Sequence, residues 1–164
     1  YVSLTEIAAP GAGAANTLRL YAFDGPSTAT GGTATVPVFV DSGGVVKIID
    51  SGVYTPTLTN GANVAASTPF AAEWMRVGKI VTVSGVVNID ATLTATLTVL
   101  GISLPVASNF SSSVQASGVC AAGSVIGEAG DIGSDAANDR VTLSVVVNTA
   151  ANHTVRYSYA YEII

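Results

Sequence analysis

The sequence is poor in charge, and its few charges are not arranged for nucleic acid. Only 10% of its 164 residues are Asp, Glu, Lys or Arg, against about 25% in a typical soluble domain. The six basic residues are scattered along a chain of net charge −5, whereas nucleic-acid binding depends on clustered Lys and Arg. We therefore expect no nucleic-acid partner. We also expect a surface rich in Thr, Ser and Asn that is partly covered by other subunits.

Cysteine is nearly absent, and long apolar runs are absent. The single cysteine, Cys120, excludes an intrachain disulfide and a cysteine-rich metal site. Its neighbours in GVCAAG are small and none nearby is basic, so we interpret it as a buried free thiol. No apolar run reaches the roughly 18 to 20 residues of a membrane span, and no signal-peptide pattern is present. We expect no membrane insertion, and the first residue, Tyr1, suggests a processed product, a fragment or part of a longer protein.

Strand-forming residues dominate what is present. Val, Thr, Ile and Tyr are punctuated by Gly, Asn and Asp, and apolar residues alternate in three places, which predicts strands with one buried face. The apolar sets are Val81, Val83, Val87 and Ile89; Val141, Leu143, Val145 and Val147; and Val155, Tyr157, Tyr159, Tyr161 and Ile163. Turns are predicted at Asn88–Asp90, Asp135–Asp139 and Asn148–Asn152. Residues 51–164 are therefore predicted to form an all-β antiparallel β-sandwich, jelly-roll-like in type.

A fourth alternating pattern occupies residues 93–105. Its first apolar set alternates with threonines and predicts a strand that buries Leu93, Ala95, Leu97 and Val99. Ile102 and Leu104 restart the apolar face in the opposite phase, which predicts a bulge or bend near Gly101. Pro105 ends the pattern.

The first 50 residues have a different composition. A small-residue linker, EIAAPGAGAAN, precedes three short predicted strands, the last two on either side of Ser42-Gly43-Gly44. The predicted strands are Leu18–Phe23, Thr35–Val40 and Val45–Ile49. Three short strands cannot bury a core alone. We therefore predict that residues 1–50 intertwine with copies of the chain, with a domain boundary near Asp50–Gly52.

Glu128 and Asp131, in GEAGDIG, are the carboxylate pair that best fits catalysis or Ca²⁺ binding. They lack the D-x-[DN]-x-[DN]-G spacing of a Ca²⁺ loop. Most of the eleven carboxylates lie beside Gly or Asn in predicted turns, where Asp caps its own backbone. We favour turn chemistry and expect no metal and no cofactor, and Ca²⁺ binding by this pair stays open. The glycine motifs GAGAAN and GSVIGEAG lack the strand-then-helix context of a phosphate loop.

His153 is the only histidine and lies in NTAANHTV, at a predicted turn entering the last strand. One histidine suffices for a Ser-His-Asp triad but not for a three-His zinc site. No G-x-S-x-G nucleophile motif is present. We interpret His153 as a turn or interface histidine and expect no enzymatic activity.

The stretch EWMRVGK contains the only Trp, Trp74, and two basic residues, Arg76 and Lys79. An aromatic at a sandwich edge either stacks on a sugar ring or closes the end of a core, and we favour packing. Val77-Gly78 between the basic residues predicts a tight turn. The candidate ligand or interface contacts in the whole chain are Trp74, Arg76, Tyr157 and Tyr159.

A family resemblance runs through nearly the whole chain. SGVYTPTLTNGANVAAST, then WMRVGKIVTVSGVVNID, LGISLPVASNF and YSYAYEII, resemble a β-sandwich module at the C-terminus of tailed-bacteriophage fibre and virion structural proteins. Upstream, VSLTEIAAPGAGAANTLRLYAFDG and VPVFVDSGGV resemble the linker-and-strand segment that precedes such modules. The most specific motif is Y-x-P-x-L-T-N with M-R-V-G-x-x-V-x-V-S-G.

The resemblance implies a non-enzymatic homotrimer on the virion, as a tail-fibre or receptor-binding tip module. Its implied partners are its own copies, other virion proteins, and a host cell-surface glycan or protein. Residues 1–50 would then be a trimerisation segment, because threefold closure consumes strand edges without open-ended polymerisation. One alternative is a capsid-attached head fibre or decoration protein. Another is the C-terminal fragment of a polysaccharide depolymerase tailspike, which would need an upstream β-helix and a carboxylate cluster in a groove.

Overall fold

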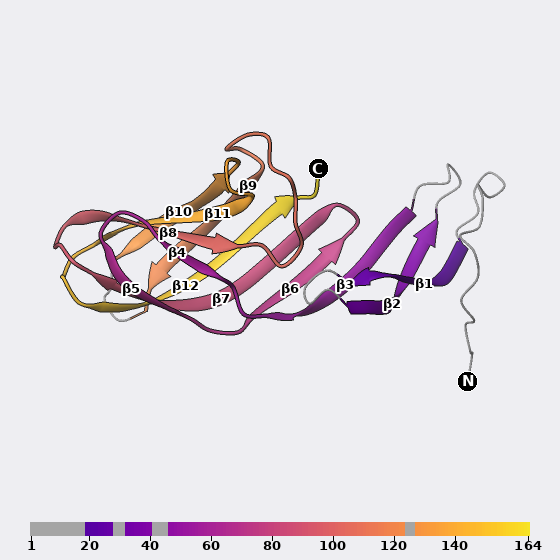
Figure 1. Cartoon of the computed structure of the whole chain (residues 1–164), viewed down its shortest axis with the longest axis horizontal. Coiled ribbons are helices and arrows are strands. Elements are labelled where there is room, and N and C mark those ends of the chain that lie inside the picture. The colour runs from indigo at the N-terminus through magenta and orange to yellow at the C-terminus, as the bar shows by residue number, and fades with distance from the viewer. Residues whose placement is uncertain (1–18, 28–31, 41–45, 124–126) are drawn as a thin grey trace.

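Every described element of the computed structural model is a strand (Figure 1). The structure describes residues 19–27, 32–40, 46–123 and 127–164, with side chains from residue 48 onward. All the strand pairs in this part of the chain are antiparallel. The predicted all-β antiparallel class is confirmed, and the described residues include no helix that is long and apolar enough to cross a membrane.

Twelve strands form one continuous sheet. They are β1 (Arg19–Ser27), β2 (Gly32–Val40), β3 (Val46–Tyr54), β4 (Leu58–Asn60), β5 (Val64–Pro69), β6 (Ala72–Val77), β7 (Ile80–Ala91), β8 (Thr96–Ser103), β9 (Ala116–Ala122), β10 (Ala129–Asp135), β11 (Arg140–Val147) and β12 (Asn152–Glu162). Their order in the sheet is β1-β2-β3-β6-β7-β12-β9-β10-β11-β8-β4, and β5 pairs with β7.

The sheet curls around its core because β7 is long and changes partners along its length. The first half of β7 pairs with β6 and the second half pairs with β5. β4 immediately precedes β5 and pairs with β8, at the far end of the strand order. The β4–β5 segment therefore connects two distant parts of the sheet and encloses the inner face, which faces the core.

Three of the four predicted alternations have the predicted phase. Their apolar residues are buried on β7, β11 and β12, apart from Ile163, which is partly buried beyond the end of β12. The same phase places the intervening residues of these strands on the outer face, away from the core. The predicted turns at Asp135–Asp139 and Asn148–Asn152 lie at the β10–β11 and β11–β12 connections.

The predicted phase of the fourth strand is wrong. β8 buries Thr98, Leu100 and Ile102, whereas Leu93 and Leu97 are exposed. Asn63 provides the physical reason, because its Nδ2 donates to Thr98 Oγ1 at 2.8 Å and so satisfies a buried hydroxyl. Asn63 Oδ1 also accepts from the Leu93 backbone N at 2.7 Å and holds that residue in a turn before β8.

Two other local predictions are wrong. No bulge occurs near Gly101, because Leu100, Gly101 and Ile102 pair with β11 in unbroken register. Gly101 leaves room for the Arg140 side chain, whose guanidinium carbon would lie 2.8 Å from a Cβ at this position. The segment Asn88–Asp90 is not a turn but lies inside β7, paired on both sides by β12 and β5.

The predicted tight turn after β6 is confirmed. Val77 and Ile80 pair directly, which leaves Gly78 and Lys79 as a two-residue hairpin loop. Gly78 has φ +63°, as the first central position of a type II′ turn requires. Trp74 lies inside β6.

The three predicted N-terminal strands correspond to β1, β2 and the start of β3. β3 pairs with β2 through residues 46–48 and with β6 through residues 49–54, so it joins the β1–β2 ribbon to the curled sheet (Figure 1). The predicted boundary near Asp50–Gly52 falls within this strand and stays a prediction, as does intertwining. The predicted linker and the turn at Ser42-Gly43-Gly44 lie outside the described residues.

Candidate functional site

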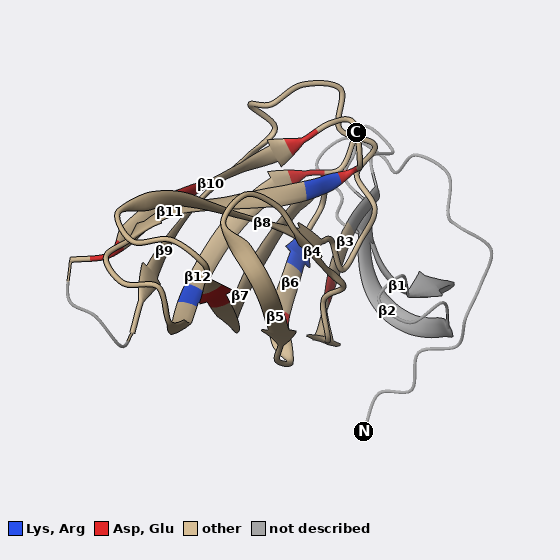
Figure 2. Cartoon of the chain, turned by 60° about the vertical axis from the view of Figure 1, so that its left-hand side comes forward, with Lys and Arg blue, Asp and Glu red and all other residues tan. Residues whose placement is uncertain are grey.

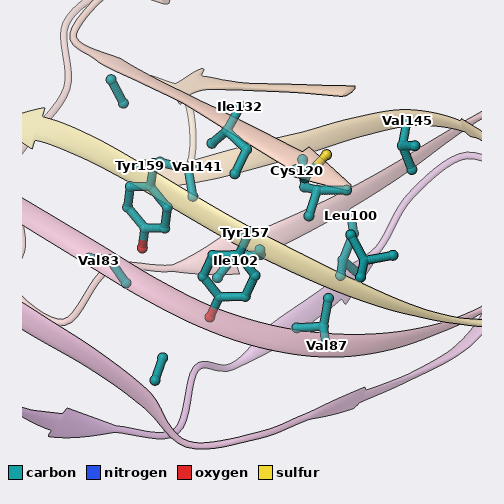
Figure 3. Packing of buried hydrophobic residues seen from close by; sticks show 14 of the residues in the cluster. Val83, Val87, Leu100, Ile102, Cys120, Ile132, Val141, Val145, Tyr157 and Tyr159 are labelled. Atoms are coloured by element: carbon teal, nitrogen blue, oxygen red, sulfur yellow. The ribbon is translucent and has the colours of Figure 1, made fainter. Parts of the chain in front are cut away.

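Three of the four candidate contact residues lie in the core. Trp74 is 4% exposed, and Tyr157 and Tyr159 are each 3% exposed. Figure 3 shows both tyrosines projecting from β12 to the same side, toward β7. Arg76 is partly buried, and its Nε donates to the Gly78 carbonyl at 2.7 Å, across the hairpin loop. This placement agrees with the packing interpretation of Trp74 rather than with a sugar-stacking surface.

The inward tyrosines of β12 form a stacked ladder. Ring centroids are 6.0 Å apart for Tyr157 and Tyr159, and 6.1 Å apart for Tyr159 and Tyr161. The Tyr54 hydroxyl donates its hydrogen to the Ser103 carbonyl at 3.1 Å. The Tyr54 and Tyr159 hydroxyl oxygens also lie 3.1 Å apart, and there Tyr159 is the donor and Tyr54 the acceptor. Burial raises the pKa of Tyr54 and of the three ladder tyrosines, which keeps their hydroxyls protonated.

One hydroxyl of the ladder has no hydrogen-bond partner. Tyr157 Oη is buried and unpaired, whereas Tyr161 Oη donates to the Val106 carbonyl at 2.6 Å. Gly85 lies directly opposite Tyr157 on β7, and a Cβ there would contact the Tyr157 hydroxyl and lie 2.8 Å from Ala72 Cβ. The glycine therefore makes room for the phenol.

The only histidine belongs to a buried polar cluster with Glu128. His153 Nδ1 lies 2.8 Å from Glu128 Oε2, and both side chains are almost fully buried. Glu128 Oε1 accepts from the Asn148 backbone N at 2.6 Å, and His153 Nε2 lies 2.9 Å from the Thr149 carbonyl. The cluster thus holds the β11–β12 connection against β12 and against the segment just before β10.

Thr149, His153 and Glu128 have the composition of a catalytic triad but not its hydrogen bonding. Thr149 Oγ1 lies 3.4 Å from His153 Nε2, which is the nitrogen that would have to accept its proton. That nitrogen faces the Thr149 carbonyl at 2.9 Å, and a carbonyl only accepts, so Nε2 carries a hydrogen. A protonated Nε2 cannot act as a general base toward the hydroxyl. The geometry supports a structural histidine beside the predicted turn, at the second residue of β12.

Glu128 and Asp131 do not meet. Glu128 is buried under the β11–β12 connection, whereas Asp131 is exposed on the outer face of β10. The two carboxylates therefore lie on opposite faces of the sheet and cannot share a Ca²⁺ ion. Among the residues that the structure describes, no three His, Cys, Asp or Glu side chains cluster closely enough to hold a metal ion.

Cys120 is buried on the inner face of β9, as its small neighbours predicted. Figure 3 shows its sulfur among core side chains. Burial, and secondarily the charge of Asp131, raises the pKa of the thiol to about 11. The thiol therefore stays protonated and packs as a small hydrophobe rather than acting as a nucleophile.

Three recesses of the described surface lie along the outer face. One is an open groove of about 610 Å³ over β7, β12, β9 and β10, where Val86, Val119, Ala121 and Ala129 surround Arg156. Smaller recesses of about 260 Å³ and 240 Å³ lie beside Met75 and Ile80. Figure 2 shows how few charged residues the described strands carry.

The large apolar side chains of this outer face were missed by the sequence analysis. The alternation that buries Val145 on β11 necessarily turns Val146 outward. The same pattern in the sequence could therefore have predicted an exposed apolar residue at this position. Comparison of the chain with models of protein families, with curated proteins and with solved structures finds no match.

Proposed function

We propose that this chain is a non-enzymatic structural protein of a bacteriophage virion, a tail-fibre or receptor-binding tip module that assembles as a homotrimer. The motif pair Y-x-P-x-L-T-N and M-R-V-G-x-x-V-x-V-S-G supports the family assignment, since it runs from β3 into β7. The observation that carries the proposal is the division of the sheet into two faces. The inner face encloses most of the described aromatic side chains together with Cys120, Glu128 and His153, whereas the outer face exposes large apolar side chains.

A structural role also agrees with the placement of the histidine, cysteine and tyrosine side chains, which are catalytic groups in many enzymes. His153 uses both ring nitrogens within the fold, and burial keeps the Cys120 thiol and the tyrosine hydroxyls protonated. These side chains stabilise the protomer rather than face a substrate. Contact with a host glycan or protein would then involve the assembled fibre rather than a catalytic cleft.

The sequence of the complete gene and its neighbours tests the proposal most widely. Adjacent tail genes would support a tail-fibre module, and adjacent capsid genes would identify a head fibre or decoration protein. A long upstream β-helix would favour a depolymerase tailspike. Gold-labelled antibody against the chain should decorate intact particles, and labelling of host cytoplasm alone would contradict a virion location.

A depolymerase assay tests the non-enzymatic part separately. The purified chain should release no soluble sugar from bacterial capsule, because the described part offers neither a poised base nor a carboxylate pair in a groove. Sugar release by this chain alone would contradict the proposal.

A further inference from the structure

The outer face of the curled sheet carries most of the exposed large hydrophobic residues of the described chain. Eight of them project from it: Ile49, Val53, Met75, Val77, Ile80, Leu97, Val119 and Val146. Strand register groups Ile49, Val77 and Ile80. It also pairs Leu97 with Val146, whereas Val119 lies between Ser158 and Asp131. Soluble monomers rarely expose contiguous apolar patches larger than a few hundred Å². Such a face requires a covering surface.

The face has two halves of different shape. The groove half is the open groove around Val119, Ala121 and Ala129, in which Val119 is 68% exposed. The strip half consists of the outward side chains of β6 and its neighbours, with Met75 at 52% and Val77 at 53% exposed. The two halves are neighbours in the sheet, since only β7 and β12 lie between β6 and β9.

Each half carries exposed charges of both signs, and a further exposed acid, Glu162 on β12, borders the strip half opposite Ile80. The groove half has Arg156 on β12 and Asp131 on β10, on either side of β9, and the strip half has Glu73 on β6 and Lys79 in the hairpin loop. Within the part of the chain that the structure describes, the ion pairs are Arg140–Asp135 and His153–Glu128, so none of these four is engaged there. The halves are therefore complementary in charge.

We propose that the outer face is the contact surface between copies of this chain, with the groove half of one protomer against the strip half of the next. The inference rests on the proposed homotrimer, because a threefold axis brings two different parts of one surface together and closes the ring. Arg156 then faces Glu73 of the neighbouring copy, and Asp131 faces its Lys79. Opposite charges at such a contact fix its register.

The test measures assembly of the full chain by sedimentation equilibrium, with circular dichroism as the check on folding. Val119→Asp places a charge in the groove and should weaken assembly at least about tenfold, with an unchanged strand spectrum. Leu93→Asp is the matched control, because Leu93 is 58% exposed in the β7–β8 connection rather than on the outer face. It should leave the assembled mass unchanged.

A charge exchange tests which halves meet. Arg156→Glu alone and Glu73→Arg alone should each weaken assembly, and the double variant should restore it to within about threefold of the wild type. If the double variant is no better than either single variant, the pairing of the two halves is overturned.

The outcomes separate this inference from the proposed function. A wild-type trimer that persists in folded Val119→Asp overturns the interface and leaves the trimer standing. A wild-type monomer whose groove binds a glycan or another protein overturns both the interface and the homotrimer.

Discussion

The inner and outer faces of the curled sheet differ in the contacts that their side chains make. On the inner face, tyrosines stack, and the buried Glu128 and His153 side chains lie 2.8 Å apart as an ion pair. On the outer face, Val119 and Val146 lie open although they flank core residues along the same strands. Strand alternation alone would have allowed Ser or Thr at these outward positions. The difference indicates that the inner face specifies the protomer, and that the outer face serves a contact beyond it.

Alkaline pH should produce the largest effect, and it acts on the inner face. The pKa values of the four buried tyrosines are raised from the usual 10.0 in the folded state. The folded protein then holds these protons more tightly than the unfolded chain. Stability is therefore complete below pH about 10 and falls above it by up to about 1.4 kcal/mol per pH unit for each such tyrosine.

Tyrosinate absorbance and circular dichroism, recorded in one titration, test this expectation. Absorbance from the buried tyrosines should rise together with loss of the strand spectrum. Titration of all six tyrosines near pH 10 with the spectrum intact would show that the ladder is not buried as described.

Breaking the buried ion pair should be the most destabilising single substitution. Glu128→Leu or His153→Leu leaves the other group buried without its partner and should cost about 3–5 kcal/mol in denaturant unfolding. The double Leu variant should cost much less, because no unpaired charge remains. Asp135→Asn is the control, since it breaks the partly exposed Arg140–Asp135 pair and should cost less than about 1 kcal/mol. Equal losses from the two pairs would contradict the buried placement.

Overpacking beside the tyrosine ladder should have an intermediate effect. Gly85→Ala pushes a methyl against Tyr157 and Ala72 and should cost about 1–3 kcal/mol of unfolding free energy. Gly133→Ala on the outer face is its control, because the nearest atom would be Ser113 O at 3.8 Å. Adding Tyr157→Phe should recover part of the Gly85→Ala loss, and no recovery would show that the hydroxyl is not the obstacle.

Removal of a single hydroxyl should affect stability differently at Tyr157 and at Tyr161. Tyr157→Phe deletes an unpaired buried hydroxyl and should leave stability unchanged or raise it by up to about 1 kcal/mol. Tyr161→Phe removes the partner of the Val106 backbone and should lower stability by about 1–2 kcal/mol. Thermal unfolding of the two variants side by side checks the difference, and a reversed order would contradict the assigned hydrogen bonds.

The smallest effect on folding is expected on the outer face. Val119→Thr should change the unfolding free energy of the protomer by less than about 0.5 kcal/mol, when measured under conditions where the chain is monomeric. Val145→Thr puts the same hydroxyl on the inner face and should cost about 1–3 kcal/mol. Similar costs at both positions would remove the contrast between the faces.

The sequence predicted correctly the strands in which apolar and polar residues alternate without interruption. β11 and β12 show an unbroken period of two, and the observed burial follows it. The predicted phase of β8 was wrong because Leu93 and Ala95 precede the strand, and because Asn63, distant in sequence, satisfies the buried Thr98. Local alternation contains no information about such a long-range hydrogen bond.

The candidate site was less accessible to prediction for the same reason. Trp74 was correctly interpreted as a packing residue, and Cys120 as a buried thiol. The Glu128–His153 pair joins residues 25 positions apart, and only the order of β9, β10, β11 and β12 in the sheet brings them together. The outer face could have been predicted, by asking what the residues between the buried positions were for.

The most direct test of the division into two faces is the mass of the intact wild-type chain in solution. Sedimentation equilibrium across the micromolar range should give a particle three times the 16.4 kDa of one chain, and Val119→Asp should reduce it to a folded monomer. A wild-type chain that stays folded and monomeric throughout, with its outer face open to solvent, would contradict the account.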